Sequence, residues 1–519
     1  MEKTITLENN YICLRCPYSD GMKKRIMEIP GRLFIREDNC WKFPAAPMYA
    51  VLVVAFGNEM GFDISLDVLK LSRFTLNPII KQDRSLLYPF QEEAVDFIHK
   101  MNGNCLVSDA CGLGKSVESL WAIKEWQNTT KVLIVSPASV IYKWQDEVKK
   151  WLGIDAYVIK TTKQDIPKGD YFLIMSYDIL TRVANKIDNY RFDLMICDEC
   201  HYITNHKTRR ANAVKAIHAK GKLMLSGTPF LNRPIELWNI LNTLNPYRWQ
   251  SWGAFATKYA NGHKDRYGHF DVSGASNIPE LKQLLEPIMI RRLKKDVLKD
   301  LPDLTRTILP VDVDTTEYNF ALKNLRVWLA EQGKVTVTPN ALSKLNYLRQ
   351  LVGKAKINAA VEFADDFLND SDERKLVLYA HHKEVVTALV DKLQKWGVDT
   401  IVGDDSNTKR ADTIRRFQEK VLPRVLVISS AGGEGVDLWR ADTLLFVESE
   451  WNMSKMEQVE GRLHRIGQCN PVNSYKLIAN DTIDWKIHLL LQEKSGIING
   501  VIGGTSIEEI ILNDIVKGV

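Results

Sequence analysis

The chain has few cysteines and no long hydrophobic segment. Eight cysteines among 519 residues are too few for the disulfide framework of small secreted domains. The longest apolar runs, such as residues 48–56, fall well short of the roughly 20 residues that span a bilayer. The N-terminal sequence MEKTITLENN lacks the apolar core of a signal peptide. We therefore expect a soluble, intracellular protein.

An excess of one charge is also missing. The 69 lysines and arginines nearly balance 64 aspartates and glutamates, which leaves a net charge of +5. Any basic surface must therefore be local, which is compatible with a nucleic-acid groove but does not require one. With 45% hydrophobic residues the composition is that of a globular protein, and the length predicts three or four domains.

Two pairs of cysteines have a spacing that metal sites use. Cys13 and Cys16 have no second pair nearby, and Cys197 and Cys200 bracket two acidic residues. Structural zinc sites usually need four ligands. We therefore favour small buried residues on strands over a metal site for both pairs.

Hydrophobic patterning predicts an α/β protein with a small α+β unit in front. The small unit has alternating, strand-like runs at 4–7 and 11–16, a helix from 19 or 20 to 28, a hairpin of 32–36 and 40–43, and a helix after Pro47. Beyond residue 86, short apolar runs alternate with helical segments, which is typical of a parallel sheet covered on both faces. These runs lie at 105–108, 132–135, 171–175, 194–197 and 223–225, and again at 375–379, 399–402, 425–428 and 443–447.

The same patterning predicts five segments. They are an N-terminal domain (1–80), a first lobe (81–305) with a helical insertion at about 230–290, a helical linker (306–345), a second lobe (346–480) and two C-terminal helices (481–519).

A glycine-rich segment, DACGLGKS at 109–116, follows the first of these apolar runs. Gly112 and Gly114 would let backbone amides cradle an anion at the start of a helix. Lys115 would meet the β- and γ-phosphates, and the Ser116 hydroxyl would bind magnesium. Asp109 stands where such loops usually begin with glycine, so a chance match is the alternative.

Two acidic residues, Asp198 and Glu199, end another apolar run. Ligands of open α/β sheets bind at these strand ends. Asp198 would hold magnesium, and Glu199 would orient and deprotonate an attacking water. A solvated acidic strand end is the alternative, which a phosphate loop in the same lobe disfavours.

A pair of arginines, Arg462 and Arg465, follows the second lobe, which has no phosphate loop of its own. An arginine directed at the γ-phosphate stabilises the charge of the transition state. We predict that this lobe donates both arginines to the triphosphate, whereas an isolated pair of this kind would be read as a basic surface helix.

These motifs, in this order, resemble those of superfamily-two helicase-like ATPases, specifically the Swi/Snf-type double-stranded DNA translocases. The sequence RRLKKDV at 291–297 is diagnostic of this type. The resemblance covers about residues 85–495 and implies two RecA-like lobes that use ATP and Mg²⁺. The other matching segments are 87–91, 109–116, 132–139, 175–177, 198–201, 226–232, 431–438 and 458–468.

The resemblance also implies roles for individual residues. Nucleotide contacts would come from Gln91, which reads the base, and from Gly112, Gly114, Gly435, Asp437 and Gln458. Contacts to the DNA backbone, or coupling between DNA and ATP, would come from Pro137, Ser176, Tyr177, Ser226 and Thr228. The basic residues of 291–295 could bind DNA or brace the helical insertion, and we favour bracing. Ala110, Cys111 and Gly461 depart from the family pattern, which bears on rate and affinity more than on hydrolysis itself.

Residues 1–45 resemble the substrate-recognition domain of annealing helicases of the HepA-related-protein type, which helps such enzymes engage branched DNA. Trp41 in the predicted hairpin could stack on an unpaired base or pack in the core. A generic capping subdomain is the alternative for the whole unit.

The resulting hypothesis is an ATP-dependent translocase on double-stranded and branched DNA, which anneals strands, migrates branches or reverses forks. Alternatives are a translocase that displaces proteins such as polymerase from duplex DNA, and a nucleotide-gated DNA-binding scaffold with little turnover. We expect a monomer in the cytoplasm of a bacterium or a bacteriophage-infected cell, or in the nucleus if the source is eukaryotic.

Overall fold

The computed structural model describes the chain apart from residues 1–2, 9–10, 28, 30–31, 36, 46, 73–78, 168, 188–189, 228–232, 247, 265–267, 269, 333–337, 431–435, 499–506 and 518–519. Two compact units are present. The first comprises Met1–Asp109, Gly114–Val272 and Ser276–Arg292, and the second comprises Ala110–Leu113, Ser273–Ala275 and Leu293–Val519. Among the described residues, no helix is long and apolar enough to cross a membrane.

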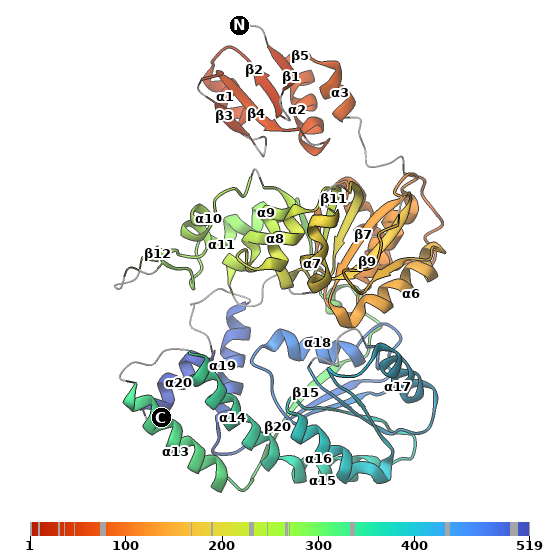
Figure 1. Cartoon of the computed structure of the whole chain (residues 1–519), viewed down its shortest axis with the longest axis vertical. Helices are drawn as coiled ribbons and strands as arrows, with labels where there is room; N and C mark the ends of the chain where they lie inside the picture. The colour runs from red at the N-terminus through yellow and green to blue at the C-terminus, as the bar shows by residue number, and fades with distance from the viewer. Residues whose placement is uncertain are drawn as a thin grey trace. The chain divides into compact units, whose positions relative to one another are not determined.

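The N-terminal part of the first unit is a small α+β fold, drawn in red in Figure 1. Its five strands have the order β3-β4-β2-β1-β5, and the hairpin predicted at 32–43 is the antiparallel pair β3 and β4. Ser19 caps the first helix by accepting a hydrogen bond from the Met22 amide. The elements are β1 (Thr4–Glu8), β2 (Tyr11–Arg15), α1 (Asp20–Ile26), β3 (Leu33–Ile35), β4 (Cys40–Pro44), α2 (Pro47–Met60), β5 (Asp63–Ile64) and α3 (Leu66–Ser72).

The main sheet of the first unit has seven strands in the order β14-β6-β11-β10-β7-β9-β8. Every neighbouring pair is parallel, as the alternating pattern predicts. The strands are β6 (Cys105–Val107), β7 (Lys131–Ser136), β8 (Tyr157–Ile159), β9 (Tyr171–Ser176), β10 (Phe192–Cys197), β11 (Ala219–Leu225) and β14 (Met289–Ile290). The two edge strands, β8 and β14, have no counterpart among the predicted runs.

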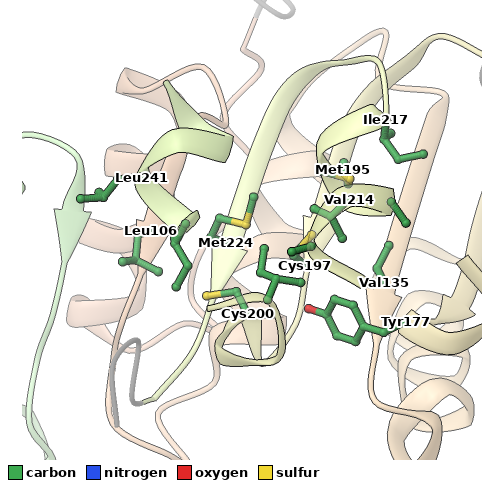
Figure 2. Packing of buried hydrophobic residues seen from close by; sticks show 14 of the residues in the cluster. Leu106, Val135, Tyr177, Met195, Cys197, Cys200, Val214, Ile217, Met224 and Leu241 are labelled. Atoms are coloured by element: carbon green, nitrogen blue, oxygen red, sulfur yellow. The ribbon is translucent and has the colours of Figure 1, made fainter. Parts of the chain in front are cut away.

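Helices cover both faces of this sheet (Figure 1). Alternate residues of one strand therefore enter different cores: on β10, Met195 and Cys197 belong to one cluster, and Leu194 and Ile196 belong to the other. Figure 2 shows part of the first cluster around Met195 and Cys197. The helices are α4 (Pro89–Lys100), α5 (Lys115–Glu125), α6 (Ile141–Leu152), α7 (Tyr177–Ile187) and α8 (Arg209–Ala216).

The segment expected to be a helical insertion is helical in the ranges that the structure describes. It also contains a short antiparallel pair, β12 (His263–Lys264) and β13 (Phe270–Asp271), that was not predicted. Trp238, Trp249 and Phe255 are buried there, in the same core as α7 and β10. The helices are α9 (Leu237–Leu244), α10 (Trp252–Tyr259) and α11 (Ile278–Leu285).

The second unit has a six-stranded sheet, again parallel throughout, in the order β15-β20-β19-β16-β18-β17. The four strands predicted for this lobe are β16 (Leu376–Tyr379), β17 (Val398–Ile401), β18 (Val425–Ile428) and β19 (Thr443–Phe446), and the sheet also contains β15 (Leu304–Val311) and β20 (Val472–Ala479). The expected fold class, two parallel-sheet α/β lobes with a small α+β domain, is confirmed.

One prediction in this region is wrong in its first residues. Residues 306–345 were expected to form a helical linker, yet residues 306–311 belong to β15, which pairs along its whole length with β20. All residues of the edge strand β15 are partly or fully exposed. Its sequence LTRTILPV therefore lacks the continuous apolar run of a central parallel strand. The helices that follow are α13 (Thr316–Glu331), α14 (Pro339–Ala355), α15 (Ile357–Asn369), α16 (Lys383–Leu393), α17 (Asn407–Glu419) and α18 (Met453–Leu463).

The two C-terminal helices expected from the sequence are α19 (Ile483–Ile498) and α20 (Ile507–Lys517). Ile487 and Leu491 of α19 and Ile511 and Leu512 of α20 are buried in the same core as α14. Residues 499–506, between the two helices, lie outside the described residues.

Candidate functional site

The glycine-rich loop joins β6 to the start of α5. Gly112 and Gly114 have φ values of 89° and 94°, in the left-handed region that favours glycine. Gly114 is the N-cap of α5, and the Lys115 ammonium donates to the Asp109 carbonyl oxygen at 2.8 Å. The loop therefore has the backbone form of an anion cradle at a helix N-terminus, with a lysine at its end.

Gln91 packs against this loop from the first turn of α4. Its side-chain oxygen accepts a hydrogen bond from the Tyr88 amide at 3.1 Å, and the residue is only 4% exposed. A Cβ atom placed on Gly114 would lie 2.3 Å from the Gln91 side-chain nitrogen. The structure thus brings Gln91 and the loop together, while the contact of Gln91 with a base stays a prediction.

The acidic pair lies at the carboxyl end of β10. The Asp198 carboxylate accepts from the Glu199 amide at 3.0 Å and from the indole nitrogen of Trp144 at 2.8 Å. Burial, followed by the charge of Glu199, raises the pKa of Asp198 to about 6 in spite of these hydrogen bonds. Since β6 and β10 both neighbour β11, the loop and the acidic pair both lie at the carboxyl ends of the strands, with one strand between them.

Glu199 adopts a left-handed backbone conformation that is uncommon for residues other than glycine, with φ 48° and ψ 53°. Its carboxylate lies 3.1 Å from Nδ1 of His201 and 3.5 Å from the hydroxyl of Ser226, and His201 and Ser226 are 3.3 Å apart. The Ser226 amide donates to the carbonyl oxygen of Val107, the last residue of β6. Strain of this kind is found where the surroundings fix a residue for a function.

Tyr177 holds the acidic pair from another side. Its hydroxyl donates to the Asp198 carbonyl oxygen at 2.7 Å, and the side chain is 2% exposed. Figure 2 shows its ring within the buried cluster near Cys197 and Cys200. This placement favours coupling to the acidic pair over direct contact with DNA.

The other residues predicted to touch DNA are buried or partly buried. Ser226 is fully buried, Pro137 is buried, and the Ser176 hydroxyl accepts from the Ile179 amide at the start of α7. Thr228 lies outside the described residues. Trp41 is half-buried, packs on the core of the N-terminal domain, and has its ring 4.8 Å from that of Phe34.

The cysteines of both pairs belong to hydrophobic surroundings. Cys197 and Cys200 lie in the core shown in Figure 2. Burial raises the pKa of the Cys197 and Cys13 thiols to about 12 and that of Cys16 above its usual value. Cys13, Cys197 and Cys200 are buried, and Cys16 is partly buried.

The arginine pair lies in the second unit, at the end of α18 and just beyond it. Arg465 forms an ion pair with Asp437, and the Arg462 carbonyl accepts from the Leu438 amide at 2.9 Å. Arg462 and Gln458 are half-buried on α18. The second unit therefore brings Asp437 and the arginines together, whereas Gly435 lies outside the described residues.

Two residues with clear structural roles at these motifs were not predicted. Trp144 is one of them, and its hydrogen bond to Asp198 joins residues 54 positions apart. The buried Gln468 side chain donates to the carbonyl oxygens of Trp439 and Ala441 and so fixes the turn after Arg465. Gln468 falls in a matching motif, which is a signal for it, whereas the sequence contains none for Trp144.

The comparisons with known proteins agree with this geometry. The SNF2-related domain matches residues 90–357, slightly more than half of the chain. The chain belongs to the SNF2-related family. The helicase conserved C-terminal domain matches residues 356–467, which include the arginine pair. The family resemblance found in the sequence is thereby confirmed.

Several curated proteins are similar to this SNF2-related chain. It is 31% identical over 444 residues to the DNA annealing helicase and endonuclease ZRANB3 of Homo sapiens, a match that covers 81% of this chain and 41% of the relative. It is 33% identical over 421 residues to the SWI/SNF-related matrix-associated actin-dependent regulator of chromatin subfamily A-like protein 1 of Xenopus tropicalis, covering 79% and 44%. The chain spans less than half the length of these two relatives.

Among solved structures, the Sulfolobus solfataricus SWI2/SNF2 ATPase core in complex with dsDNA is 25% identical and has a TM-score of 0.40. The match covers 84% of this chain and 96% of that chain.

Proposed function

We propose that this SNF2-related chain is an ATP-driven motor that moves on double-stranded DNA and remodels branched DNA. The observation that carries the proposal is the pairing of a lysine-ended glycine loop after β6 with the Asp198–Glu199 pair after β10. These are the parts that bind and hydrolyse a nucleoside triphosphate, and they occur at the strand ends where open α/β sheets bind ligands.

The phosphate end of the site has donors suited to a nucleotide and its magnesium. Lys115 would neutralise the β- and γ-phosphates, and the amides after Gly114 would donate to them. The Ser116 hydroxyl and the Asp198 carboxylate are hard oxygen ligands of the kind that Mg²⁺ prefers. When bound, Mg²⁺ would offset the negative charge that develops on the phosphate oxygens.

Hydrolysis needs a base and a cation in addition. Glu199, held beside His201 and Ser226, would orient the attacking water and accept its proton. Arg462 and Arg465 would stabilise the charge of the transition state when the two lobes close on ATP. Closure and reopening in each cycle would shift one lobe along the DNA.

The proposed preference for branched DNA is supported by the name of one relative and by the sequence of the N-terminal domain. ZRANB3 carries the words annealing helicase in its name. The sequence of residues 1–45, in front of the motor, resembles the domain with which annealing helicases engage branched DNA. Most contacts of the motor with DNA should be to phosphates, so binding should weaken as salt is raised.

The test measures ATP hydrolysis by the full chain with no nucleic acid, single-stranded DNA, blunt duplex, a model fork and duplex RNA. We expect the fork to stimulate most, and Lys115→Ala to hydrolyse at background rate in every arm. Equal stimulation by fork and plain duplex would contradict the branched-DNA role and favour a translocase that clears proteins from duplexes. Normal turnover in Lys115→Ala would contradict the nucleotide site.

A second arm assigns the fork preference to the N-terminal domain. A chain that lacks residues 1–80 should keep its duplex-stimulated rate and lose the extra stimulation by the fork. The rate on blunt duplex is the internal control, because it shows that the motor still folds. An unchanged fork preference would mean that the domain serves another purpose.

A further inference from the structure

Arg292 stands at the point where the chain leaves the first unit. It follows β14, which pairs in parallel with β6, and the next residue, Leu293, belongs to the second unit. Strand β6 leads to Asp109, and the residue after Asp109 also belongs to the second unit. Arg292 and Asp109 are therefore the last residues of the first unit at two neighbouring exits of the chain.

These two residues bind one another, although 183 positions separate them. The Arg292 amide donates to Oδ1 of Asp109 at 2.9 Å, and its Nε lies 3.2 Å and 3.1 Å from the two carboxylate oxygens. A terminal guanidinium nitrogen also donates to Oδ2. Asp109 is fully buried, and Arg292 is the main charge partner of its carboxylate. The planar guanidinium donates to both carboxylate oxygens, a geometry that only arginine provides.

The same guanidinium reaches the two helices that flank the nucleotide loop. Its other terminal nitrogen donates to the carbonyl oxygen of Phe90, the residue before Gln91, and the group lies 5.4 Å from the centre of the Phe90 ring. On α5, the fully buried Glu118 carboxylate is 3.4 Å away. One side chain therefore contacts the start of α4, the start of the loop and α5.

The packing leaves little freedom for a replacement. Two buried carboxylates face one guanidinium whose side chain is 11% exposed. Removal of one partner from a buried ion pair leaves an uncompensated charge, which costs far more than loss of an exposed pair. Lysine would keep the charge and lose the planar fork.

We propose that Arg292 is a positioning residue that fixes the glycine-rich loop and α4 in their nucleotide-binding arrangement. It holds both at the point where the chain passes into the second unit. The proposal rests on the proposed function, since it assumes that this loop binds a nucleotide. Arg292 acts through Asp109 and Phe90, and it touches no reacting atom.

The experiment measures ADP affinity of the full chain by calorimetry, with steady-state KM and kcat for ATP beside it. Arg292→Met should weaken ADP binding at least tenfold and raise KM by a similar factor, and Arg292→Lys should restore part of the loss. The control is Lys299→Met, which removes one positive charge from an exposed position seven residues further along. A purely structural role would lower kcat through loss of folded protein and leave KM unchanged.

A double variant keeps the test decisive if Arg292→Met folds poorly. Asp109→Asn with Arg292→Met removes the carboxylate charge that Arg292 mainly neutralises and leaves Glu118 in place, so its melting temperature should recover part of the way towards wild type while ADP affinity stays at least tenfold weak. Affinity within twofold of wild type in folded Arg292→Met, alone or combined with Asp109→Asn, would overturn the proposal. If wild-type protein itself fails to bind ADP, the proposed function is what fails.

Discussion

Replacement of Trp144 by phenylalanine should weaken magnesium binding without removing the nucleotide site. Trp144 is 2% exposed on α6, and its indole nitrogen donates to Oδ2 of Asp198 at 2.8 Å. Phenylalanine fills most of the same space but donates no hydrogen bond. The perturbation therefore acts on the orientation of the carboxylate that we assign to the metal.

The expected magnitude follows from the partner that is lost. A hydrogen bond to a charged group contributes roughly 1.5–3 kcal/mol. Residues that orient a metal ligand typically account for about 10–100-fold in metal affinity or activity. We expect Trp144→Phe to raise the Mg²⁺ concentration for half-maximal ATPase rate by about tenfold, which corresponds to roughly 1.4 kcal/mol.

The assay titrates Mg²⁺ at saturating ATP and repeats the titration for Mg²⁺-dependent ADP binding. The same helix offers a matched control in Trp151, whose indole nitrogen donates to Glu147 at 2.7 Å. Trp151→Phe removes the same kind of bond to a carboxylate outside the strand-end pair. Both variants lose some thermal stability, and only Trp144→Phe should shift the Mg²⁺ dependence. Identical half-saturation in the two variants would refute the reasoning and reduce Trp144 to packing.

Three further predictions test other parts of the chain. Glu199→Gln should keep nucleotide affinity within about threefold in equilibrium binding yet lower kcat at least 100-fold, and loss of both would mean that Glu199 is structural. Gly114→Ala should weaken nucleotide binding, because its Cβ would displace the buried side-chain nitrogen of Gln91, whereas Gly153→Ala, also at positive φ but with no atom within 4 Å, should bind normally. Burial raises the pKa of Glu450, but the nearby His381, the charge of Lys455 and a hydrogen bond from Tyr379 outweigh it and lower the pKa from 4.5 to about 2. This stabilisation is present above pH 4.5 and is lost as the pH falls towards 2. The difference in free energy of unfolding between wild type and Glu450→Gln, measured by denaturant melts, should therefore shrink by about 3 kcal/mol between pH 4.5 and pH 2. A difference that does not change with pH would contradict the lowered pKa of Glu450.

Most central strands of the two sheets could be predicted because burial on both faces produces continuous apolar runs, although the central strand β20 was missed and the edge strand β17 was predicted. Strands such as β10 (FDLMIC) are continuous apolar runs, and helices of the expected kind separate them. The edge strands β8, β14 and β15 were not predicted, since an edge strand is short or mixed in polarity. Whether β15 joins a sheet depends on its pairing with β20, which lies more than 150 residues away and has no local signal.

The candidate site divides in the same way. Lys115, Asp198 and Arg465 lie in contiguous motifs whose chemistry is evident from residue type and spacing. The roles of the residues that hold them are not evident in this way, because Trp144 and Arg292 act through hydrogen bonds across 54 and 183 positions. A tryptophan at helical spacing and an arginine in a basic run have the same appearance whether or not such a partner exists.

The acidic pair is held from three directions, and this arrangement constrains how the proposed motor can respond to DNA. Asp198 is contacted by Trp144 of α6 and Tyr177 of α7, and Glu199 lies near Ser226 after β11. The segments that precede α6, begin α7 and follow β11 are those that resemble the DNA-facing and coupling motifs of the family. Because Tyr177 and Ser226 are themselves buried, a shift of these segments on DNA would reach the Asp198 backbone carbonyl through Tyr177 and the Glu199 carboxylate through Ser226. Stimulation of hydrolysis by DNA would then require only that these hydrogen bonds change length. A close-packed lobe transmits such small displacements over short distances.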